Sequence, residues 1–181
     1  MAAKAVRVSW NRCRFDGMGD GRYRISIFNA LQASPLLSSG RRARWLRRFG
    51  FDIDPSAVIY ENVFFGSRSV RIERDCFISV NCFFDGSELI HIGAGVSMGP
   101  HVKLITSTHE PAEPERRAGR LIRAPITVGA GSWIGAGAIL LPGVEIGPGC
   151  IIAAGAVVTA STAPHGVYAG MPAMRKKDLP R

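Results

Sequence analysis

Residues 128–163 read VGAGSW IGAGAI LLPGVE IGPGCI IAAGAV VTASTA, and they divide into six blocks of six residues. The first residue of each block is aliphatic, and the fifth is small or of modest size. The first positions are Val128, Ile134, Leu140, Ile146, Ile152 and Val158. The fifth positions are Ser132, Ala138, Val144, Cys150, Ala156 and Thr162. A period of six is neither the helical period nor a simple two-residue alternation.

The same rhythm is present upstream, interrupted by two slips. Its first positions are Ile53, Ile59 and Phe65, then Ile72, Ile78 and Phe84, then Ile92, Met98 and Leu104. A short strand followed by a sharp bend gives this period, with the aliphatic residue inward and glycine where the backbone turns tightly. Three such strands close one triangular coil, and the coils stack as parallel strands ~4.8 Å apart. Because one coil cannot bury its own core, many must stack, so the sequence predicts an all-β solenoid.

These hexads resemble those of the hexapeptide-repeat acyltransferases, over residues 53–175. The resemblance implies a left-handed parallel β-helix, which departs from the usual right-handed crossover. We therefore expect an N-terminal extension with a helical cap over residues 1–50, a β-helix acyltransferase domain over 51–175, and a basic tail over 176–181. Within the β-helix we expect an extruded loop over residues 110–124.

Two helices are predicted before the repeat. The segment YRISIFNALQASPLL predicts a helix that ends near Ser34–Pro35, and SSGRRARWLRRFG offers a serine cap and a glycine stop. Five arginines lie between Arg41 and Arg48. They could attract an anionic membrane surface or a phosphorylated acceptor. We favour the other interpretation, in which the Trp45, Leu46 and Phe49 face covers the open end of the prism and the arginines lie in water, because a solenoid needs a cap.

The net charge of +9 favours an acidic partner such as nucleic acid, an anionic membrane or a phosphorylated small molecule. No nucleic-acid-binding motif is recognisable, so no nucleic-acid partner is expected. Between Arg123 and Arg175 only Glu145 is formally charged, which imitates a membrane span, but glycine and proline recur too often there for a spanning helix.

The cysteines indicate no redox or metal-finger chemistry. Cys76, Cys82 and Cys150 occupy fifth positions, where a small apolar side chain is wanted, and Cys13 lies outside the repeat. The N-terminus has no uninterrupted apolar stretch of the kind a secretory signal needs. We expect interior thiols and a cytoplasmic protein.

The repeat stops after His109, where EPAEPERRAGR carries prolines and charges that keep it in solvent. A histidine before such a loop resembles the galactoside, maltose and streptogramin O-acetyltransferases, in which this histidine is the general base. The resemblance implies direct acetyl transfer from acetyl-CoA to a hydroxyl, with His109 accepting the hydroxyl proton, since imidazole is mostly neutral near pH 7. It also implies a homotrimer with active sites between subunits.

Two polar residues upstream, in SVNCFFDG, are candidates to support this base. Asn81 resembles a residue of the family that contacts substrate or orients the histidine. Asp85 is a candidate to orient the imidazole or to bind an acceptor hydroxyl. The alternative for both is that they satisfy backbone groups in turns, as Asn and Asp often do.

The resemblance also implies where the donor binds. The positions that match contacts to the pantetheine arm are Gly135, Ala136, Ala153, Ala154 and Thr159. A backbone N–H near Gly135–Ala136 is expected to stabilise the oxyanion. The final segment matches the family's GxPA motif, so the following Arg175, Lys176 and Lys177 are expected to meet the nucleotide phosphates. Met174 departs from the family, where a basic residue is common, and a solvated tail is the alternative.

A related β-helix binds zinc through three histidines, but no third ligand accompanies His101 and His109 at the expected spacing, so no metal is expected. His91, His101 and His165 are expected to be structural or exposed. The sequence thus predicts an acetyl-CoA-dependent O-acetyltransferase whose acceptor is a sugar-like, glycolipid or antibiotic-like hydroxyl compound. An amine acceptor stays open, and the rival is a noncatalytic β-helix scaffold.

Overall fold

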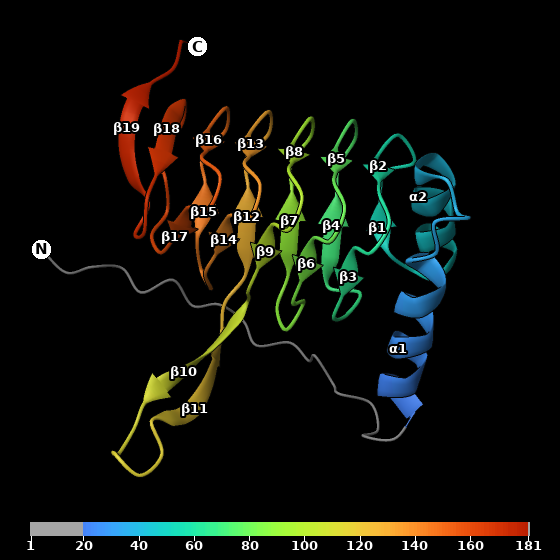
Figure 1. The fold of residues 1–181 in the computed structure, drawn as a ribbon, viewed down its shortest axis with the longest axis horizontal. Coiled ribbons are helices and arrows are strands. Elements are labelled where there is room, and N and C mark those ends of the chain that lie inside the picture. Colours follow the sequence, from blue (N-terminus) through green and yellow to red (C-terminus); the bar gives the residue numbers. More distant parts are fainter. Residues whose placement is uncertain (1–19, 181) are drawn as a thin grey trace, which may run out of the picture.

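The main body of the protein is a prism of short parallel strands that follow one another around three faces (Figure 1). The computed structural model describes residues 20–180, of which residues 20–24 are described by their backbone alone. Cys13, which the sequence places outside the repeat, is not among the described residues. The predicted all-β solenoid is confirmed.

Each face of the prism is one sheet, named here by a letter. Face A contains β1 (Asp52–Ile53), β4 (Val70–Ile72), β7 (Ile90–Ile92), β12 (Ile126–Val128) and β15 (Glu145–Ile146). Face B contains β2 (Val58–Ile59), β5 (Phe77–Ile78), β8 (Ser97–Met98), β13 (Trp133–Ile134), β16 (Ile151–Ile152), β18 (Gly166–Ala169) and β19 (Met174–Asp178). Face C contains β3 (Phe64–Phe65), β6 (Phe83–Phe84), β9 (Lys103–Leu104), β14 (Ile139–Leu140) and β17 (Val157–Val158).

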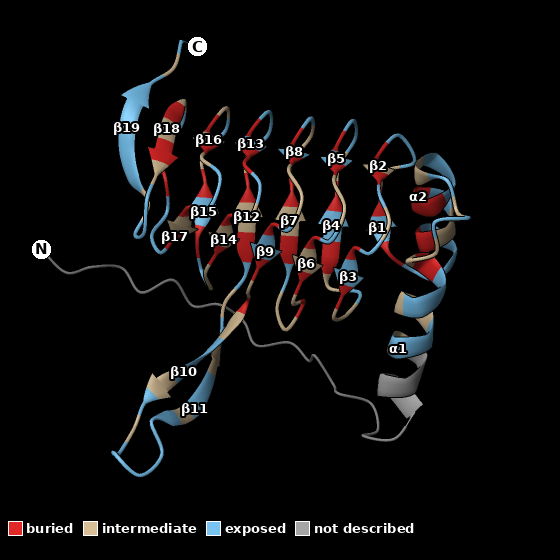
Figure 2. Ribbon diagram, in the orientation of Figure 1, coloured by how far each residue is buried: buried red, intermediate tan, exposed pale blue. Residues whose placement is uncertain are grey.

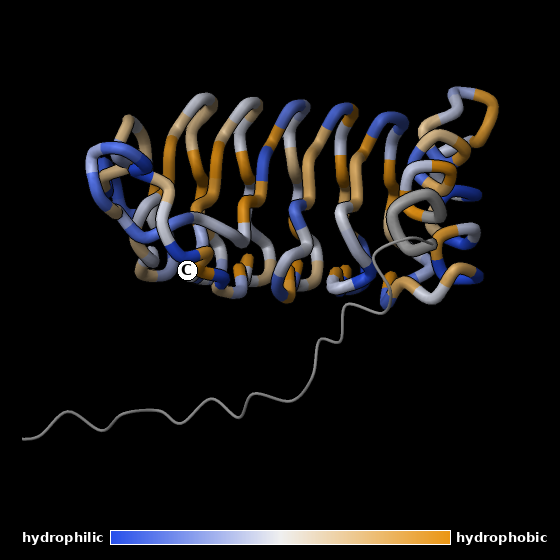
Figure 3. The backbone as a smooth tube through the Cα atoms, turned by 90° about the horizontal axis from the view of Figure 1, so that it is seen from below, coloured by the Kyte–Doolittle hydropathy of each residue, from blue (hydrophilic) through white to orange (hydrophobic). Residues whose placement is uncertain are grey.

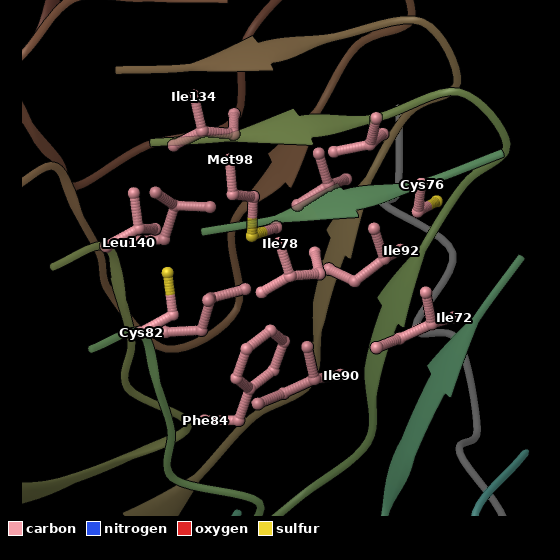
Figure 4. Close-up of a cluster of buried hydrophobic side chains, with 14 of the residues drawn as sticks. Ile72, Cys76, Ile78, Cys82, Phe84, Ile90, Ile92, Met98, Ile134 and Leu140 are labelled. Atoms are coloured by element: carbon pink, nitrogen blue, oxygen red, sulfur yellow. The ribbon is translucent and has the colours of Figure 1, made fainter. Parts of the chain in front are cut away.

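The first positions of the hexads stack in register along the interior. On face B, Ile78 pairs with Met98, and Met98 with Ile134. On face C, Phe84 pairs with Leu104, and Leu104 with Leu140. Figure 4 shows such side chains meeting between the faces, and Figure 2 shows buried and exposed residues alternating along the strands. All these inward side chains are fully buried, which removes their apolar surface from water.

The fourth position of the hexad makes the corner, because its residue adopts a positive φ. Glycine serves at Gly95, Gly131, Gly137, Gly149 and Gly155, and other residues serve at Asn62, Asp75, Asn81, His101 and His165. Asn, Asp and His tolerate this left-handed region better than most side chains. His101 and His165, which the sequence predicts to be structural or exposed, therefore have a backbone role at these corners.

Every departure from the count of six occurs at the same edge, where face C turns into face A. The intervals are Phe65 to Ile72, Phe84 to Ile92, Leu104 to Val128 and Val158 to Thr162. The last interval, from Val158 to Thr162, is four residues long and shows that Thr162 is not at the fifth position expected from the sequence. It pairs with Ile146 as the first residue of a coil, and not as a fifth position, because this turn is short.

The three described cysteines are buried, as expected. The Cys76 thiol donates to the Gly93 carbonyl, with Sγ 3.1 Å from the oxygen. Burial raises the pKa of the Cys82 thiol to about 11. Because the thiolate is the reactive form, a raised pKa keeps such a thiol unreactive.

The segment that leaves the repeat is a β-ribbon, which corrects the expected loop over residues 110–124. β10 (Ser107–Pro111) pairs antiparallel with β11 (Ala118–Arg123), and the ribbon projects from the prism (Figure 1). The excursion therefore starts at Ser107. His109 lies within the ribbon opposite Leu121, and not at a corner of the prism.

Two helices cover the N-terminal end of the prism, as the favoured interpretation predicts. They are α1 (Asp20–Gln32) and α2 (Ser39–Arg48). Leu46 is fully buried, and Phe28 stacks on both Trp45 and Phe51 with ring centroids 5.0 Å apart. Ser38 precedes α2 as expected, but its side chain makes no capping hydrogen bond.

The sequence predicts that the arginines of α2 lie in water, but one of them, Arg42, is buried. Arg42 is 1% exposed and donates four hydrogen bonds of 2.7–2.8 Å to backbone carbonyls. These acceptors belong to Gln32, Ser34, Leu37 and Ile59. Burial lowers the pKa of the guanidinium. Arg42 thus joins α1, the interhelical turn and the first coil.

At the C-terminal end, β19 pairs antiparallel with β18 and extends face B by one strand. Lys176 and Lys177 lie in this strand, so the expected basic tail over residues 176–181 belongs to face B up to Asp178. No helix among the described residues is long and apolar enough to cross a membrane.

We predict that Arg42→Ala lowers the free energy of unfolding by about 3 kcal/mol, because it leaves buried carbonyls without donors. Arg41→Ala, at an exposed position in the same helix, is expected to change it by about 0.5 kcal/mol or less. Urea unfolding of both variants measures the difference. Equal effects would show that the four hydrogen bonds do not hold the cap.

Candidate functional site

The turns between faces form three edges, and the candidate residues gather on two of them. The B/C edge consists of residues 60–63, 79–82, 99–102, 135–138 and 153–156, which join face B to face C. The C/A edge consists of residues 66–69, 85–89, 105–125, 141–144 and 159–161, which join face C to face A. Face C separates the two edges within one chain.

The structure brings one group of the predicted residues together on the B/C edge. Its members are Asn81, Gly135, Ala136, Ala153 and Ala154. Backbone hydrogen bonds connect successive turns, as from Gly135 N to Ile152 O at 2.7 Å and from Gly155 N to Ala136 O at 2.8 Å. A second group, Asp85, His109 and Thr159, lies on the C/A edge or in its ribbon. A third, Arg175 and Lys177, lies in β19.

The His109 imidazole is exposed and held by the opposite strand of the ribbon. Its Nδ1 lies 2.8 Å from the Gly119 carbonyl oxygen. A carbonyl only accepts hydrogen bonds, so in neutral imidazole Nδ1 carries the proton and donates it. Nε2 is then left with a free lone pair. This is the tautomer that a general base requires.

A charged pair braces the ribbon beside the histidine. Arg120 donates to both carboxylate oxygens of Glu110, with Nε 3.0 Å from Oε2. This contact lowers the pKa of Glu110 and raises that of Arg120. Towards the tip, a hollow of ≈ 320 Å³ open to solvent is lined by Ala112, Glu113, Arg116, Ala118 and Gly119.

Asp85 fixes the base of the ribbon. Its Oδ2 accepts hydrogen bonds from the Thr106 N–H at 3.1 Å, the Thr106 hydroxyl at 2.8 Å and the Ser107 hydroxyl at 2.9 Å. Its Oδ1 accepts one from the Ser87 hydroxyl at 3.2 Å. Three of these four hydrogen bonds of Asp85 therefore go to the residues where the chain leaves the prism, and the imidazole is held by Gly119.

Asn81 has a structural reason for its place, since it forms a corner with φ of 60°. Its side chain is exposed and makes no hydrogen bond to any described residue. The amide is thus available to a ligand or to another chain. The backbone requirement alone accounts for an asparagine here.

The B/C edge offers unused backbone donors in two successive turns. The N–H of Gly135 donates within the prism, whereas the N–H groups of Ala136 and Ala154 have no acceptor among the described residues. Gly135 itself is required for stacking, because a Cβ there would lie 2.5 Å from the backbone nitrogen of Ala154. Ala136 and Ala154 are exposed, so a ligand can reach their N–H groups.

Arg175 is engaged within its own chain. It donates to Asp178 Oδ1 at 2.8 Å, to the Tyr168 hydroxyl at 2.9 Å and to the carbonyls of Ala163, Pro164 and His165. Asp178 and Tyr168 raise its pKa. Lys176 and Lys177 are the exposed cations beside it.

Sequence reasoning missed Gly119, which contributes a backbone carbonyl and no side chain. A Cβ at this position would lie 2.8 Å from the Glu110 carbonyl oxygen, so glycine lets the two strands approach at the histidine. A glycine ten residues after the histidine was the one available signal.

The other charged cluster with a histidine lies on face A. His91 Nε2 contacts Glu73 Oε1 at 2.9 Å, and Glu73 also accepts the Ala94 N–H at 3.0 Å. These hydrogen bonds lower the pKa of Glu73. Within residues 20–180, no group of three His, Cys, Asp or Glu side chains is arranged to hold a metal ion.

We predict that Asp85→Ala frees Thr106 and Ser107, destabilises the fold by about 1–3 kcal/mol and loosens the ribbon. Trypsin should then cleave at Arg116 or Arg117 faster than in the wild type. The matched control is Asp52→Ala, which removes an exposed ion pair with Arg71 and should cost about 1 kcal/mol or less. Unchanged cleavage in Asp85→Ala would contradict the assigned role.

Comparisons with known proteins agree with the fold and the repeat. The family model of bacterial transferase hexapeptides (six repeats) matches residues 125–160. Nodulation protein L of Rhizobium leguminosarum bv. viciae is 39% identical over 67 residues, which cover 36% of this chain and 35% of that protein. The matched stretch thus spans about a third of that relative.

Solved structures match over most of the chain. A maltose O-acetyltransferase from Clostridium difficile 630 has a TM-score of 0.78 and 26% identity, covering 88% of this chain and 87% of that one. A hexapeptide-repeat acetyltransferase from Vibrio cholerae O1 biovar eltor, complexed with acetyl coenzyme A, has a TM-score of 0.71 and 26% identity. The match covers 92% of this chain and 93% of that one. A galactoside acetyltransferase in complex with coenzyme A has a TM-score of 0.68 and 25% identity, and the match covers 90% of this chain and 84% of that one.

The prism with its hexads has the left-handed β-helix fold that these enzymes represent. The chain thus carries the bacterial transferase hexapeptide repeat over residues 125–160 and resembles the maltose and galactoside O-acetyltransferases in structure over most of its length.

Proposed function

We propose that this protein transfers the acetyl group of acetyl-CoA to a hydroxyl of a sugar-like or antibiotic-like small molecule, with His109 as general base. The observation that carries the proposal is the 2.8 Å contact of His109 Nδ1 with the Gly119 carbonyl, which leaves Nε2 free. The relatives that contain acetyl coenzyme A or coenzyme A support the donor.

The proposed reaction is a direct transfer. Nε2 of His109 accepts the proton of the acceptor hydroxyl while the hydroxyl oxygen attacks the thioester carbon. A tetrahedral oxyanion forms, collapses with loss of the coenzyme A thiolate, and leaves the acetyl ester. The thiolate takes up the proton from the imidazolium. The described cysteines are buried, which fits a mechanism that needs no covalent intermediate on the enzyme.

The Ala136 N–H is proposed as the donor to the oxyanion. Of the two residues expected there, Gly135 already donates to Ile152, so Ala136 has the free N–H. A fixed backbone donor stabilises the developing charge without having to reorient. Ala153 and Ala154 would hold the pantetheine arm from the B/C edge, with Thr159 meeting it from the C/A edge of the neighbouring copy. Lys176 and Lys177 would hold the phosphates, in place of the internally bonded Arg175.

A complete site requires two copies of the chain. His109 projects from the C/A edge, whereas Ala136 and Asn81 lie on the B/C edge beyond face C. A neighbour that brings its B/C edge to the ribbon would unite the base, the oxyanion donor and the Asn81 amide. Exposed aromatic side chains on the outer surfaces of faces B and C, at Phe64, Phe77 and Trp133, support such contacts. The number of copies comes from the resemblance to the hexapeptide-repeat acyltransferases, on which we propose a homotrimer with three sites between subunits.

We predict that His109→Ala lowers kcat by about 10²–10⁴ and leaves binding of acetyl-CoA within about twofold. Release of coenzyme A thiol in the presence of hydroxyl acceptors measures the first, and calorimetric titration the second. His91→Gln, which alters the histidine on face A, is the control and should keep full activity. Loss of binding with loss of activity would indicate misfolding, and full activity of His109→Ala would leave a noncatalytic scaffold or another base.

We predict that Ala136→Phe weakens acetyl-CoA binding by about tenfold or more, because the ring covers the edge where the pantetheine arm lies. Ala130→Phe is the matched control. Both alanines are exposed and follow the glycine of a hexad, but Ala130 lies at the third edge of the prism, in the turn 129–132 that joins face A to face B. Calorimetric titration of both variants with acetyl-CoA measures the difference. Equal affinities for acetyl-CoA would show that the donor does not bind at the B/C edge.

A further inference from the structure

The N-terminal cap has an outer surface for which acetyl transfer gives no role. The inner face of α2 is defined by its buried residues Arg42, Ala43 and Leu46. At 100° per residue, Arg41, Arg44 and Arg48 fall on the opposite side of the helix, and Arg47 lies at its flank. All four are exposed. Figure 2 shows the buried part of α2 towards the prism and the exposed part away from it.

These four charges are not neutralised by nearby carboxylates. The sequence from residue 21 to 51 contains seven arginines and no Asp, Glu or Lys. None of the ion pairs within residues 20–180 includes Arg41, Arg44, Arg47 or Arg48, although Arg47 helps to lower the pKa of Asp54. Residues 21–51 thus carry a concentrated positive charge, which Asp52, Asp54 and Glu61 of the first coil offset only in part.

Large aliphatic side chains lie exposed in the same cap. Ile27 is 60% exposed, Leu31 59% and Leu36 94%. Ile27 and Leu31 are four residues apart and share one face of α1. The opposite face of α1 packs on the prism, where Asn29 bonds to the backbone of Phe65 and Gln32 to that of Val63. Figure 3 shows hydrophobic and hydrophilic stretches together at this end of the molecule.

We propose that the outer surface of the cap, formed by these four arginines with Ile27, Leu31 and Leu36, binds anionic lipid membranes peripherally. Arginines meet the headgroups by charge complementarity, and aliphatic side chains enter the boundary between headgroups and acyl chains. A nucleic acid would use the charges but has no place for three exposed aliphatic side chains. From the sequence, a cap on the prism and a contact with an anionic surface are alternatives for this helix. In this proposal both hold, since the inner face of α2 caps the prism and its outer face binds lipid.

The proposal is independent of acetyl transfer, because the cap lies at the opposite end of the prism from the later coils of the donor site (Figure 1). It implies that the prism stands on the bilayer by its first coil.

The test is sedimentation of the full chain with vesicles of phosphatidylcholine alone or mixed with phosphatidylserine. We expect binding to the mixed vesicles that weakens as salt is raised, and none to phosphatidylcholine alone. Replacing Arg41, Arg44, Arg47 and Arg48 by Gln should reduce binding by about tenfold or more. Arg42 is kept because it holds the cap together.

Two further variants make the result decisive. Replacing Arg116, Arg117, Lys176 and Lys177 by Gln removes the same charge elsewhere and should leave lipid binding within about twofold. Replacing Ile27, Leu31 and Leu36 by Ser should reduce it by about tenfold, which a purely electrostatic site would not show. Absence of wild-type binding, equal loss in the charge control, or full binding by the serine variant would overturn the proposal. Circular dichroism and elution volume confirm that each variant is folded.

Discussion

The structure depends on the stacking of one coil on the next. Each inward side chain lies between equivalents in the coils before and after it, and each turn donates backbone hydrogen bonds to its neighbour. A coil without neighbours would leave both its side chains and its carbonyls exposed, so stability comes from the repeat and not from any single unit. The two ends must then be closed by other means. Arg42 and the aromatic residues of the cap close one end, and at the other end the antiparallel β18–β19 pair ends face B.

Stacking also explains where the chain is free to vary. Two edges keep the six-residue interval throughout, whereas the C/A edge takes every change of interval, including the ribbon. A regular edge presents the same small turn repeatedly, which suits a long, thin ligand lying against backbone N–H groups such as that of Ala136. An irregular edge can carry a side chain away from the prism, as it does with His109. The proposed chemistry divides between the edges for this reason.

The imidazole illustrates how a polar group is fixed at an exposed position. Gly119 orients Nδ1, the Glu110–Arg120 pair braces the strands, and Asp85 ties the base of the ribbon to the prism. Three weak local constraints thus act on one residue, although the ribbon has no core of its own. The cap shows the converse arrangement, with one strongly hydrogen-bonded arginine inside and four others left to solvent.

The sequence alone determined the period of six, the inward rows and the interior cysteines, because each depends on the size and polarity of single residues at fixed intervals. It also indicated His109, through the interruption that follows it. The tertiary structure alone decided that the interruption is a paired ribbon, that Gly119 orients the imidazole, that Arg42 is buried and that Arg175 is engaged within the chain. The reason is that these features arise from backbone carbonyls and residues distant in the chain, and a carbonyl has no sequence signature.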